Sequence, residues 1–372
     1  MESVGIIDRP FWKGKRVVVT GHTGFKGAWL ALWLRELGAH VIGISDKIPT
    51  TPSLYEAITW GEHVENYELD IRDGEKLATA ISRAKPEIIL HLAAQSLVRA
   101  SYQDPVGTFA TNIMGTIHVF EAARRCPSVK AVVNVTSDKC YENQESSHAF
   151  REGDRIGGRD PYSCSKACAE LVTTAYQRSF FIGDAHRSTG ERRIGLASVR
   201  AGNVFGGGDW SSDRLIPDCV RSFSANTPVV IRNPESIRPW QHVLDAVRGY
   251  MLVAQNLYSH PEAYSEAFNF GPDPLEAQSV ASLVTGLTDR WGGSASWQKD
   301  ASPEGTHPHE ATLLRLDSTF AQRKLNWKQL IPLTQGLDLT VAWYRAFLGG
   351  DKMTPFTIEQ IKFVESLESA KV

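Results

Sequence analysis

The chain has 372 residues, and its 40 basic and 42 acidic side chains give a net charge of −2. That balance disfavours a nucleic-acid-binding surface or a polybasic membrane patch. No run of about 20 apolar residues occurs, and residues 1–10 lack the apolar core of a signal peptide, so we expect no membrane partner. Five cysteines, an odd number, favour a reducing compartment such as the cytoplasm.

The first two hundred residues alternate between strand and helix patterns. We expect strands over 16–20, 41–44, 87–90, 131–135 and 195–199, and helices over 28–37, 105–125 and 161–180. Gly38 is typical of the residue after a helix, whereas Pro105 and Pro161 are typical of a first helical turn. This alternation predicts an α/β fold with a Rossmann-type, doubly wound parallel sheet.

The pattern changes after Asn203. Four prolines between residues 217 and 239 predict irregular structure, followed by a helix over 241–257 and one more strand over 268–270. From Gly271 onward we expect short segments broken by prolines. We therefore predict a dinucleotide-binding domain over 11–203 and about 240–270, interleaved with a smaller substrate domain over 204–239 and 271–350.

A glycine-rich turn joins the first expected strand to the first expected helix, with the sequence Thr20-Gly-His-Thr-Gly-Phe-Lys-Gly27. Gly21 permits a tight turn, Gly24 lets the backbone approach a pyrophosphate, and Gly27 lets the helix and the strand pack closely. The helix N-terminus offers unpaired N–H groups and a positive dipole end to an anion. In this strand–turn–helix context the glycines predict a dinucleotide site.

Residues after the next two strands bear on which dinucleotide binds. Asp46 could hold the ribose hydroxyls of NAD, or Ser45 could take that place while Asp46 points away, and Lys47 keeps NADP open as a lesser alternative. Asp70 could accept from the adenine amino group and Ile71 could cover the ring, although a solvated strand end is the other interpretation. We expect NAD.

Tyr162 and Lys166 are four residues apart on an expected helix and therefore share one face. The ordinary pKa of a tyrosine is about 10, and it must fall by about 3 units before the side chain can act as a base near neutral pH. This shift corresponds to about 4 kcal/mol. One ammonium at ~4 Å supplies up to about 4 kcal/mol at an effective dielectric constant of 20. We expect the charge of Lys166 to supply nearly all of the free energy that lowers the pKa of Tyr162. An oxidised nicotinamide cation would add to it.

The segment Thr136-Ser-Asp-Lys139 follows the strand expected over 131–135. In open α/β sheets the carboxyl ends of the strands carry the ligand site. Thr136 or Ser137 could hydrogen-bond a substrate hydroxyl, while Asp138 and Lys139 offer an acid and a cation. A turn held by serine and aspartate side chains is the alternative interpretation.

Several motifs together resemble one family. The glycine turn with Phe25 is combined with His91-Leu-Ala-Ala94, Asn112-x-x-Gly-Thr116, Tyr162-x-x-x-Lys166 and Arg200-x-x-Asn203-x-x-Gly206. In this combination the chain resembles the extended short-chain dehydrogenase/reductases. Segments 137–141, 158–166, 200–210 and 237–243 resemble, within that family, the nucleotide-sugar 4,6-dehydratases of the branch that acts on CDP-glucose. The resemblance runs from about residue 11 to at least residue 327.

The resemblance implies roles for the residues at matching positions. The implied catalytic residues are Ser137, Asp138, Lys139, Tyr162 and Lys166. The implied NAD-binding residues are Gly21, Thr23, Gly24, Phe25, Lys26, Gly27, Ser45, Asp46, Asp70, Ile71, Leu92, Ala93, Ala94, Gln95, Asn112, Thr136, Tyr162 and Lys166. The implied substrate-binding residues are Ser96, Asn203, Arg214, Arg238, Trp240 and His309.

The resemblance also implies a reaction. Tyr162, aided by Lys166, removes the proton of the sugar 4-hydroxyl while hydride leaves C4 for NAD. The 4-ketone acidifies the C5 proton, Asp138 protonates the oxygen that leaves C6, and the hydride returns to C6. Most relatives place a glutamate, the presumed C5 base, where this chain has Lys139, and the CDP-glucose branch shares that change. Lys139 either stabilises the enolate or takes the C5 proton itself.

Two other functions serve as alternatives. A nucleotide-sugar 4-epimerase needs the tyrosine and lysine but no acid to expel the 6-hydroxyl, so Asp138 and Lys139 disfavour it. A non-catalytic dinucleotide sensor need not keep the tyrosine–lysine pair, and this chain has both residues. No histidine–cysteine spacing fits a metal site, so we expect no metal. By analogy with the family we expect a homodimer or homotetramer formed through helices over 104–125 and 161–180.

Overall fold

The computed structural model describes residues 5–182, 193–302 and 311–370. Its centre is a seven-stranded sheet whose neighbouring strands all pair in parallel. The expected Rossmann-type sheet is therefore confirmed. In order across the sheet the strands are β11 (Ala267–Phe270), β6 (Gly195–Ala201), β5 (Ala131–Val135), β4 (Ile88–His91), β1 (Arg16–Thr20), β2 (His40–Ser45) and β3 (Val64–Glu68).

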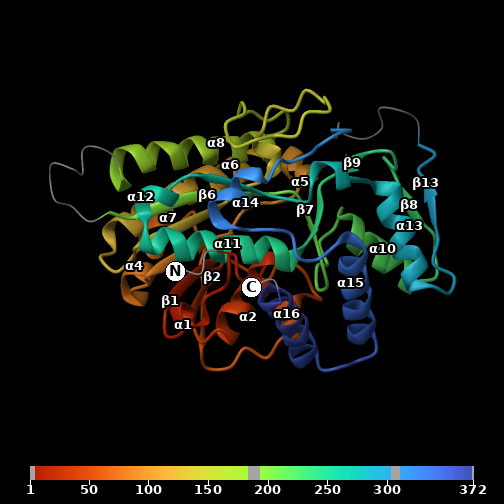
Figure 1. Cartoon of the computed structure of the whole chain (residues 1–372), viewed down its shortest axis with the longest axis horizontal. Helices are drawn as coiled ribbons and strands as arrows, with labels where there is room; N and C mark the ends of the chain where they lie inside the picture. The colour runs from red at the N-terminus through yellow and green to blue at the C-terminus, as the bar shows by residue number, and fades with distance from the viewer. Residues whose placement is uncertain (1–4, 183–192, 303–310, 371–372) are drawn as a thin grey trace.

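Helices cover both faces of this sheet (Figure 1). Successive strand residues point to opposite faces, so Val17 belongs to one apolar core and Val18 to the other. The first core is shared with α2 (Phe25–Glu36) and α11 (Val243–Ser259), and the second with α4 (Gly74–Ala84) and α7 (Gly115–Arg125). Strands buried on both faces explain the continuous apolar runs of the sequence.

The two long helices that carry site residues begin at aspartate caps. Asp104 accepts from Gly107 N at 2.8 Å, and Asp160 accepts from Ser163 N at 2.9 Å. The helix expected over 105–125 consists of α6 (Pro105–Phe109), the π-helical turn η1 (Ala110–Met114) and α7. The helix expected over 161–180 is α8 (Pro161–Tyr176) followed by the π-helical turn η3 (Gln177–Phe181).

A second lobe gathers at one end of the molecule around α10 (Leu215–Ser224), β8 (Val229–Ile231), α13 (Val280–Trp291) and β13 (Trp297–Lys299) (Figure 1). The irregular structure expected around Pro217 was wrong, because Pro217 lies in the first turn of α10, where a helix tolerates proline. The short segments expected after residue 271 were also wrong, since α13, α15 (Leu333–Leu348) and α16 (Met353–Ser369) are regular helices.

Short elements complete the described residues. Three small sheets in the described residues pair β7 (Asn203–Phe205) with β10 (Trp240–His242), β9 (Ile237–Arg238) with β12 (Gln278–Ser279), and β8 with β13. Within the described residues, no helix has the length and apolarity needed to cross a membrane. The remaining elements are α1 (Arg9–Trp12), α3 (Leu54–Ala57), α5 (Val98–Gln103), η2 (Asp138–Cys140), α12 (Pro261–Tyr264), η4 (Pro274–Glu276) and α14 (Thr319–Leu325).

Candidate active site

The glycine turn between β1 and α2 is shaped by steric limits. Gly21 has a φ of +73°, and a Cβ there would lie 2.7 Å from the backbone nitrogen of Ala93. A Cβ on Gly27 would lie 2.1 Å from Gly21 O, so only glycine lets α2 sit this close to the turn. Gly24 is the N-cap of α2 and provides no side-chain cap, which leaves the first N–H groups of the helix directed at the turn.

A buried polar network fixes the loops beside this turn. The Thr20 hydroxyl accepts from Ala93 N at 3.1 Å and lies 2.7 Å from His91 Nδ1, so it donates its proton to that nitrogen. His91 Nε2 then donates to Thr116 Oγ1, 3.1 Å away. Burial lowers the pKa of His91 to about 3, in keeping with a neutral ring. The network therefore holds the ends of β1 and β4 against α7.

Asn112 lies in the π-helical turn η1 and is 1% exposed. Its amide exchanges two hydrogen bonds of 2.9 Å with the backbone of Gln95 and donates to Ser165 Oγ at 2.8 Å. Asn112 thus ties the loop after β4, which contains Leu92, Ala93 and Ala94, to α8 beside Lys166. Its predicted contact with NAD stays a prediction, but its structural role is plain.

The residues at the ends of β2 and β3 include two carboxylates in different surroundings. Ser45 is buried and accepts from Thr23 N at 3.4 Å, whereas Asp46 is exposed. Asp70 is ion-paired to Arg72, with 2.5 Å between the guanidinium and the carboxylate, and hydrogen bonds from Arg72 lower the pKa of Asp70 although burial opposes this. Ile71 is 4% exposed and packs against Gly115, within the core.

A cavity of about 490 Å³ opens at the carboxyl ends of β5 and β6 and extends into the second lobe. It brings together residues from distant parts of the chain that the sequence grouped as catalytic, cofactor-binding or substrate-binding. Those that line it are Lys26, Ser96, Thr136, Ser137, Asp138, Lys139, Tyr162, Asn203, Arg214, Arg238 and Trp240. His309, the remaining predicted substrate residue, lies outside the described residues.

Tyr162 and Lys166 are both buried on α8, at 7% and 6% exposure. Lys166 Nζ donates to the carbonyl of Val135, the last residue of β5, at 3.1 Å. Burial raises the pKa of Tyr162 to about 12, with contact to Ser137 opposing, and burial lowers the pKa of Lys166 to about 8. The activation of Tyr162 by Lys166 together with a nicotinamide cation stays a prediction, and burial is the effect that such activation must overcome.

Asp138 and Lys139 both reach the cavity because β5 ends at Val135 and the chain turns into the short 3₁₀ helix η2. Ser137 begins this turn by accepting from Lys139 N at 3.2 Å. Asp138 is 4% exposed, and its Oδ2 has no hydrogen-bond partner within the described residues. Burial raises the pKa of Asp138, although the Lys139 charge opposes it. Asp138 is thus disposed to carry a proton.

Lys26 enters the cavity from the first turn of α2. Its Nζ lies 3.5 Å from the hydroxyl of Tyr250 on α11. Burial, together with the charges of Arg214 and Lys166, lowers the pKa of Lys26 to about 7, and Asp138 opposes this shift. The dinucleotide turn therefore contributes a cation to the same space as Tyr162.

The second lobe supplies the other wall of the cavity. Arg214 precedes α10 and donates to Ser96 Oγ at 3.4 Å, so two predicted substrate residues from separate lobes meet. Asn203 pairs with Trp240 where β7 lies beside β10. Arg238 is 8% exposed and donates to the Ile237 carbonyl at 2.9 Å. These positions offer cations and aromatic surface to a nucleotide diphosphate.

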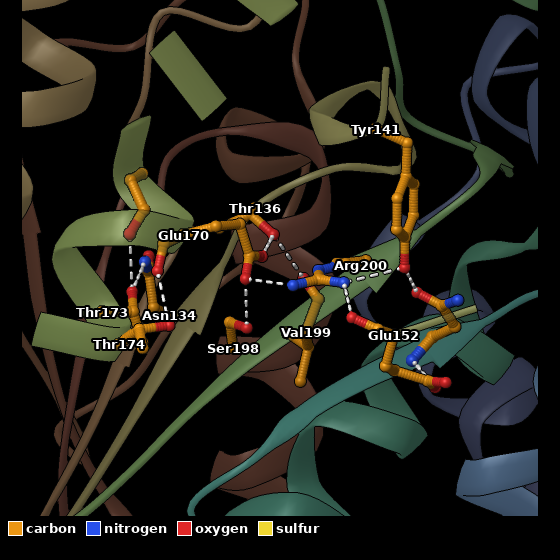
Figure 2. Close-up of polar contacts among 12 residues, drawn as sticks. Asn134, Thr136, Tyr141, Glu152, Glu170, Thr173, Thr174, Ser198, Val199 and Arg200 are labelled. Carbon is orange, nitrogen blue, oxygen red and sulfur yellow. Dashed lines mark hydrogen bonds and ion pairs between the residues drawn. The ribbon is translucent and has the colours of Figure 1, made fainter. Parts of the chain in front are cut away.

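Beneath the cavity lies a buried ionic network that the sequence reasoning did not assign (Figure 2). Glu170 on α8 accepts from Ser198 Oγ at 2.7 Å and from the Thr136 hydroxyl, and pairs with Arg200 at 2.6 Å. Arg200 continues to the hydroxyl of Tyr141 at 2.8 Å. The signal was present: Glu170 follows Lys166 by the same four-residue step that relates Lys166 to Tyr162.

Comparisons with known proteins agree with this site. Residues 18–340 match the model of the family described as GDP-mannose 4,6 dehydratase. The chain belongs to that dehydratase family. Its relative from Salmonella typhimurium (strain LT2), named CDP-glucose 4,6-dehydratase, is 51% identical over 348 residues, covering 94% of this chain and 95% of that protein. The dTDP-glucose 4,6-dehydratase of Neisseria gonorrhoeae is 25% identical, covering 89% of this chain and 95% of that protein.

Solved structures show that the dehydratase fold is shared with epimerases. The dTDP-glucose 4,6-dehydratase DesIV from Streptomyces venezuelae, solved with NAD bound, has a TM-score of 0.73 at 25% identity, covering 91% of this chain and 99% of that chain. The epimerase Mth375 from Methanothermobacter thermautotrophicus has a TM-score of 0.76 at 25% identity, covering 92% and 96%. The fold alone thus does not separate the two activities, and the residues in the cavity must do so.

Proposed function

We propose that this protein is an NAD-dependent hydro-lyase that converts CDP-glucose into CDP-4-dehydro-6-deoxyglucose. The observation that carries the proposal is Asp138, which lies in the same cavity as Tyr162. It is a buried acid with a raised pKa, and its Oδ2 has no hydrogen-bond partner in the part of the chain that the structure describes. An epimerase has no step that needs this acid. The 51% identity to a CDP-glucose 4,6-dehydratase, over nearly the whole of both chains, supports cytidine as the nucleoside of the substrate.

Two of the proton movements are assigned to residues of this chain. Tyr162 takes the proton of the 4-hydroxyl, and Asp138 gives a proton to the oxygen that leaves C6. Ser137 lies beside both, because it contacts Tyr162 and donates to Asp138 Oδ1 at 3.0 Å. Lys139 acts in the elimination, either by stabilising the enolate or by taking the C5 proton. Lys166 supplies the positive charge behind Tyr162.

The dinucleotide turn fits NAD. Its positive-φ Gly21, the close packing at Gly27 and the uncapped start of α2 form a cradle for a pyrophosphate. Ser45 ends β2 and Asp46 follows it, and these two residues are assigned to the ribose. The ion pair with Asp70 holds Arg72 away from a 2′-phosphate. When bound, NAD supplies a hydride acceptor and a cationic nicotinamide ring. The further residues assigned to it are Thr23, Phe25, Lys26, Leu92, Ala93, Ala94, Gln95, Asn112 and Thr136.

The second lobe is assigned to the nucleotide diphosphate. Arg214 and Arg238 line the cavity and can donate parallel hydrogen bonds to phosphate oxygens. Ser96, Asn203 and Trp240 complete the assignment, and His309 stays a prediction. The product is a 4-keto-6-deoxy sugar, the class of precursor from which deoxysugars are made.

A homodimer is the proposed assembly. Three large apolar side chains are exposed on neighbouring helices, Val106 on α6 at 77%, Met114 on η1 at 46% and Leu171 on α8 at 62%. The pairing of α6 and α8 within one subunit places these side chains on adjoining surfaces. Burying them against a second copy would remove apolar area from water.

The five cysteines, all free, support a reducing compartment such as the cytoplasm.

Incubation of the purified protein with NAD and CDP-glucose tests the proposal. We expect a product with the alkali-induced absorbance of a 4-keto sugar, formed without net consumption of NAD. Substrate carrying deuterium at C4 should give product carrying deuterium at C6. A product that is a C4 epimer without a keto group would establish the epimerase alternative, and loss of the label to solvent would refute hydride return within one site.

A further inference from the structure

One face of α8 carries three ionisable residues at successive turns. Tyr162 and Lys166 belong to the proposed chemistry, and Glu170 continues the same row below the cavity. Glu170 is 3% exposed and lies too deep to meet a substrate. We propose that Glu170 is a positioning residue that orients Lys166 and preserves its positive charge behind Tyr162. This inference rests on the proposed function, because it assigns Lys166 a role in that reaction.

The first support is a closed chain of contacts between helix and strand. Lys166 Nζ donates to the carbonyl of Val135 at 3.1 Å, and the next residue, Thr136, donates from its hydroxyl to Glu170. Glu170 therefore fixes the end of β5, and the end of β5 fixes the direction of the Lys166 side chain. Figure 2 shows Glu170 between Thr136, Ser198 and Arg200, with each of these side chains directed at the carboxylate.

The second support is the charge around Lys166. Four groups from four elements face it: Glu170 on α8, Cys140 on η2, His91 on β4 and Lys26 on α2. Burial lowers the pKa of His91 to about 3 and raises that of the Cys140 thiol, so both are neutral near pH 7. Lys26 is a competing cation. Of these four groups, Glu170 is therefore the one that favours the charged form of Lys166.

Glu170 can hold this charge because its own partners keep it ionised. Burial opposes ionisation, but the Arg200 charge and the hydrogen bonds from Arg200, Thr136 and Ser198 leave its pKa lowered. Lys166, by contrast, has a pKa of about 8 because burial dominates. Loss of the Glu170 charge must lower that pKa further, so Lys166 would lose its proton at a lower pH and Tyr162 would become harder to ionise.

The test compares the holoenzyme of the wild type with Glu170→Gln, measuring kcat/KM for CDP-glucose across pH. In the wild type the high-pH limb reports loss of the Lys166 proton. We expect this limb to move to lower pH by roughly one unit or more in the variant, because Lys166 loses its proton more readily without the Glu170 charge. A parallel measurement follows the acetylation of Lys166 by limiting acetic anhydride, read by mass spectrometry as a function of pH, and needs no substrate.

Two further variants separate positioning from folding. Glu170→Gln leaves Arg200 buried without its partner and can destabilise the chain, whereas Glu170→Gln combined with Arg200→Met removes both charges. Thr173→Val is the matched control, since it breaks another buried bond from α8 to β5, the 2.9 Å contact with Asn134, and leaves Glu170 intact. We expect the double variant to fold and to keep the shifted pH profile, and the control to keep the wild-type profile.

The outcomes discriminate clearly. A double variant with the wild-type pH profile, or an unchanged Lys166 acetylation curve in Glu170→Gln, would reduce Glu170 to a structural anchor and overturn the inference. A wild-type enzyme that does not convert CDP-glucose would refute the proposed function, and in that case the acetylation curve alone decides the role of Glu170. A lowered acetylation midpoint with an unaffected Thr173→Val control supports the inference.

Discussion

Two buried carboxylates lie near the end of β5, one above it and one below. Asp138 lines the cavity, is 4% exposed and leaves Oδ2 without a partner within the described residues. Glu170 is equally buried at 3% exposure, yet it is ion-paired to Arg200 and accepts from two hydroxyls. Burial raises the pKa of Asp138, whereas the partners of Glu170 overcome its burial and lower the pKa.

The comparison shows that burial destabilises the ionised form of both carboxylates. Direct hydrogen-bond and ion-pair partners decide whether that destabilisation is overcome. The cations near Asp138, Lys139 and Arg238, act through charge but do not satisfy its second oxygen. At Glu170 a guanidinium and two hydroxyls are in direct contact. Burial and missing partners thus favour the protonated form of Asp138 on the cavity side of β5, whereas direct partners favour the ionised form of Glu170 beneath it, as the proposed acid–base roles require.

The largest expected effect comes from removing Asp138, the proposed proton donor. Asp138→Asn keeps the shape of the side chain but has no acidic proton to give to the leaving oxygen. We expect turnover to fall by roughly 10² to 10⁴-fold, the usual contribution of a general acid. The first half-reaction should survive, so NADH should accumulate when CDP-glucose is added, as followed by its absorbance. Near-normal turnover in this variant would remove Asp138 from the mechanism.

The next effect concerns the free energy of unfolding. Here substitution of Glu170 is expected to have the larger effect, and substitution of Asp138 the smaller one. Glu170→Gln leaves the Arg200 charge unpaired in the interior and should lower the free energy of unfolding by about 3–5 kcal/mol. Asp138→Asn should leave it unchanged or raise it, because an ionised Asp138 is penalised by burial. Denaturant titrations at pH 7 would measure both, and an equal loss in the two variants would contradict the contrast.

The two carboxylates are expected to change the free energy of unfolding in opposite directions as the pH falls. Glu170, with a lowered pKa, contributes stability above the unfolded-state value of about 4.3, and that contribution is lost as pH falls through the folded value. Asp138, with a raised pKa, costs stability at neutral pH, and the cost shrinks as pH falls. The stability difference between Glu170→Gln and the wild type should therefore narrow in acid.

Much of this arrangement could be predicted from local sequence. Short-range patterns predict the strands β1, β2, β4, β5 and β6, the prolines in the first turns of α6 and α8, and the placement of Asp138 and Lys139 after a strand end. The state of Tyr162 could not be predicted, because its pKa depends on how deeply α8 is buried. The Glu170–Arg200 pair joins residues 30 apart on a helix and a strand, and only the folded chain brings them together.

The second lobe was harder to predict for a different reason. Its helices α10 and α15 begin at or near prolines, Pro217 and Pro332, and from sequence alone such prolines predict irregular structure or a helix end. A proline in the first turn loses no internal hydrogen bond, so the same residue can begin a helix or prevent one. Which of the two occurs depends on the apolar residues that follow, and here they pack against the sheet-side core.

A smaller effect is expected at the cation beside Asp138. Lys139→Met should still reduce NAD on addition of CDP-glucose, because Tyr162 and Lys166 are intact. Elimination should slow by about a hundredfold, as on loss of one group that stabilises a developing anion. The C5 position should show little exchange with deuterated solvent. Turnover near the wild-type rate would make Lys139 a neighbour without a role, and loss of NADH formation would place it in binding.

The smallest effect extends the contrast between paired and unpaired charges to the edge of the sheet. Arg72 lies after β3, where a 2′-phosphate of NADP could be bound, but its guanidinium is held by Asp70 at 2.5 Å. Asp70→Asn removes the negative charge and releases Arg72. We expect NAD to be preferred by the wild type, and the variant to narrow that preference by less than about fivefold, since exposed ion pairs contribute only about 0.2–1 kcal/mol.

Titration of each apoprotein with NAD and with NADP, followed by tryptophan fluorescence, measures this preference. Asp73→Asn is the matched control, because it breaks a neighbouring exposed pair, the 2.7 Å contact with Lys76, without touching Arg72. The control should keep the wild-type ratio of affinities, and added salt should weaken NADP binding to Asp70→Asn more than NAD binding. A wild-type chain that binds NADP as tightly as NAD would show that the Asp70–Arg72 pair does not restrain the arginine.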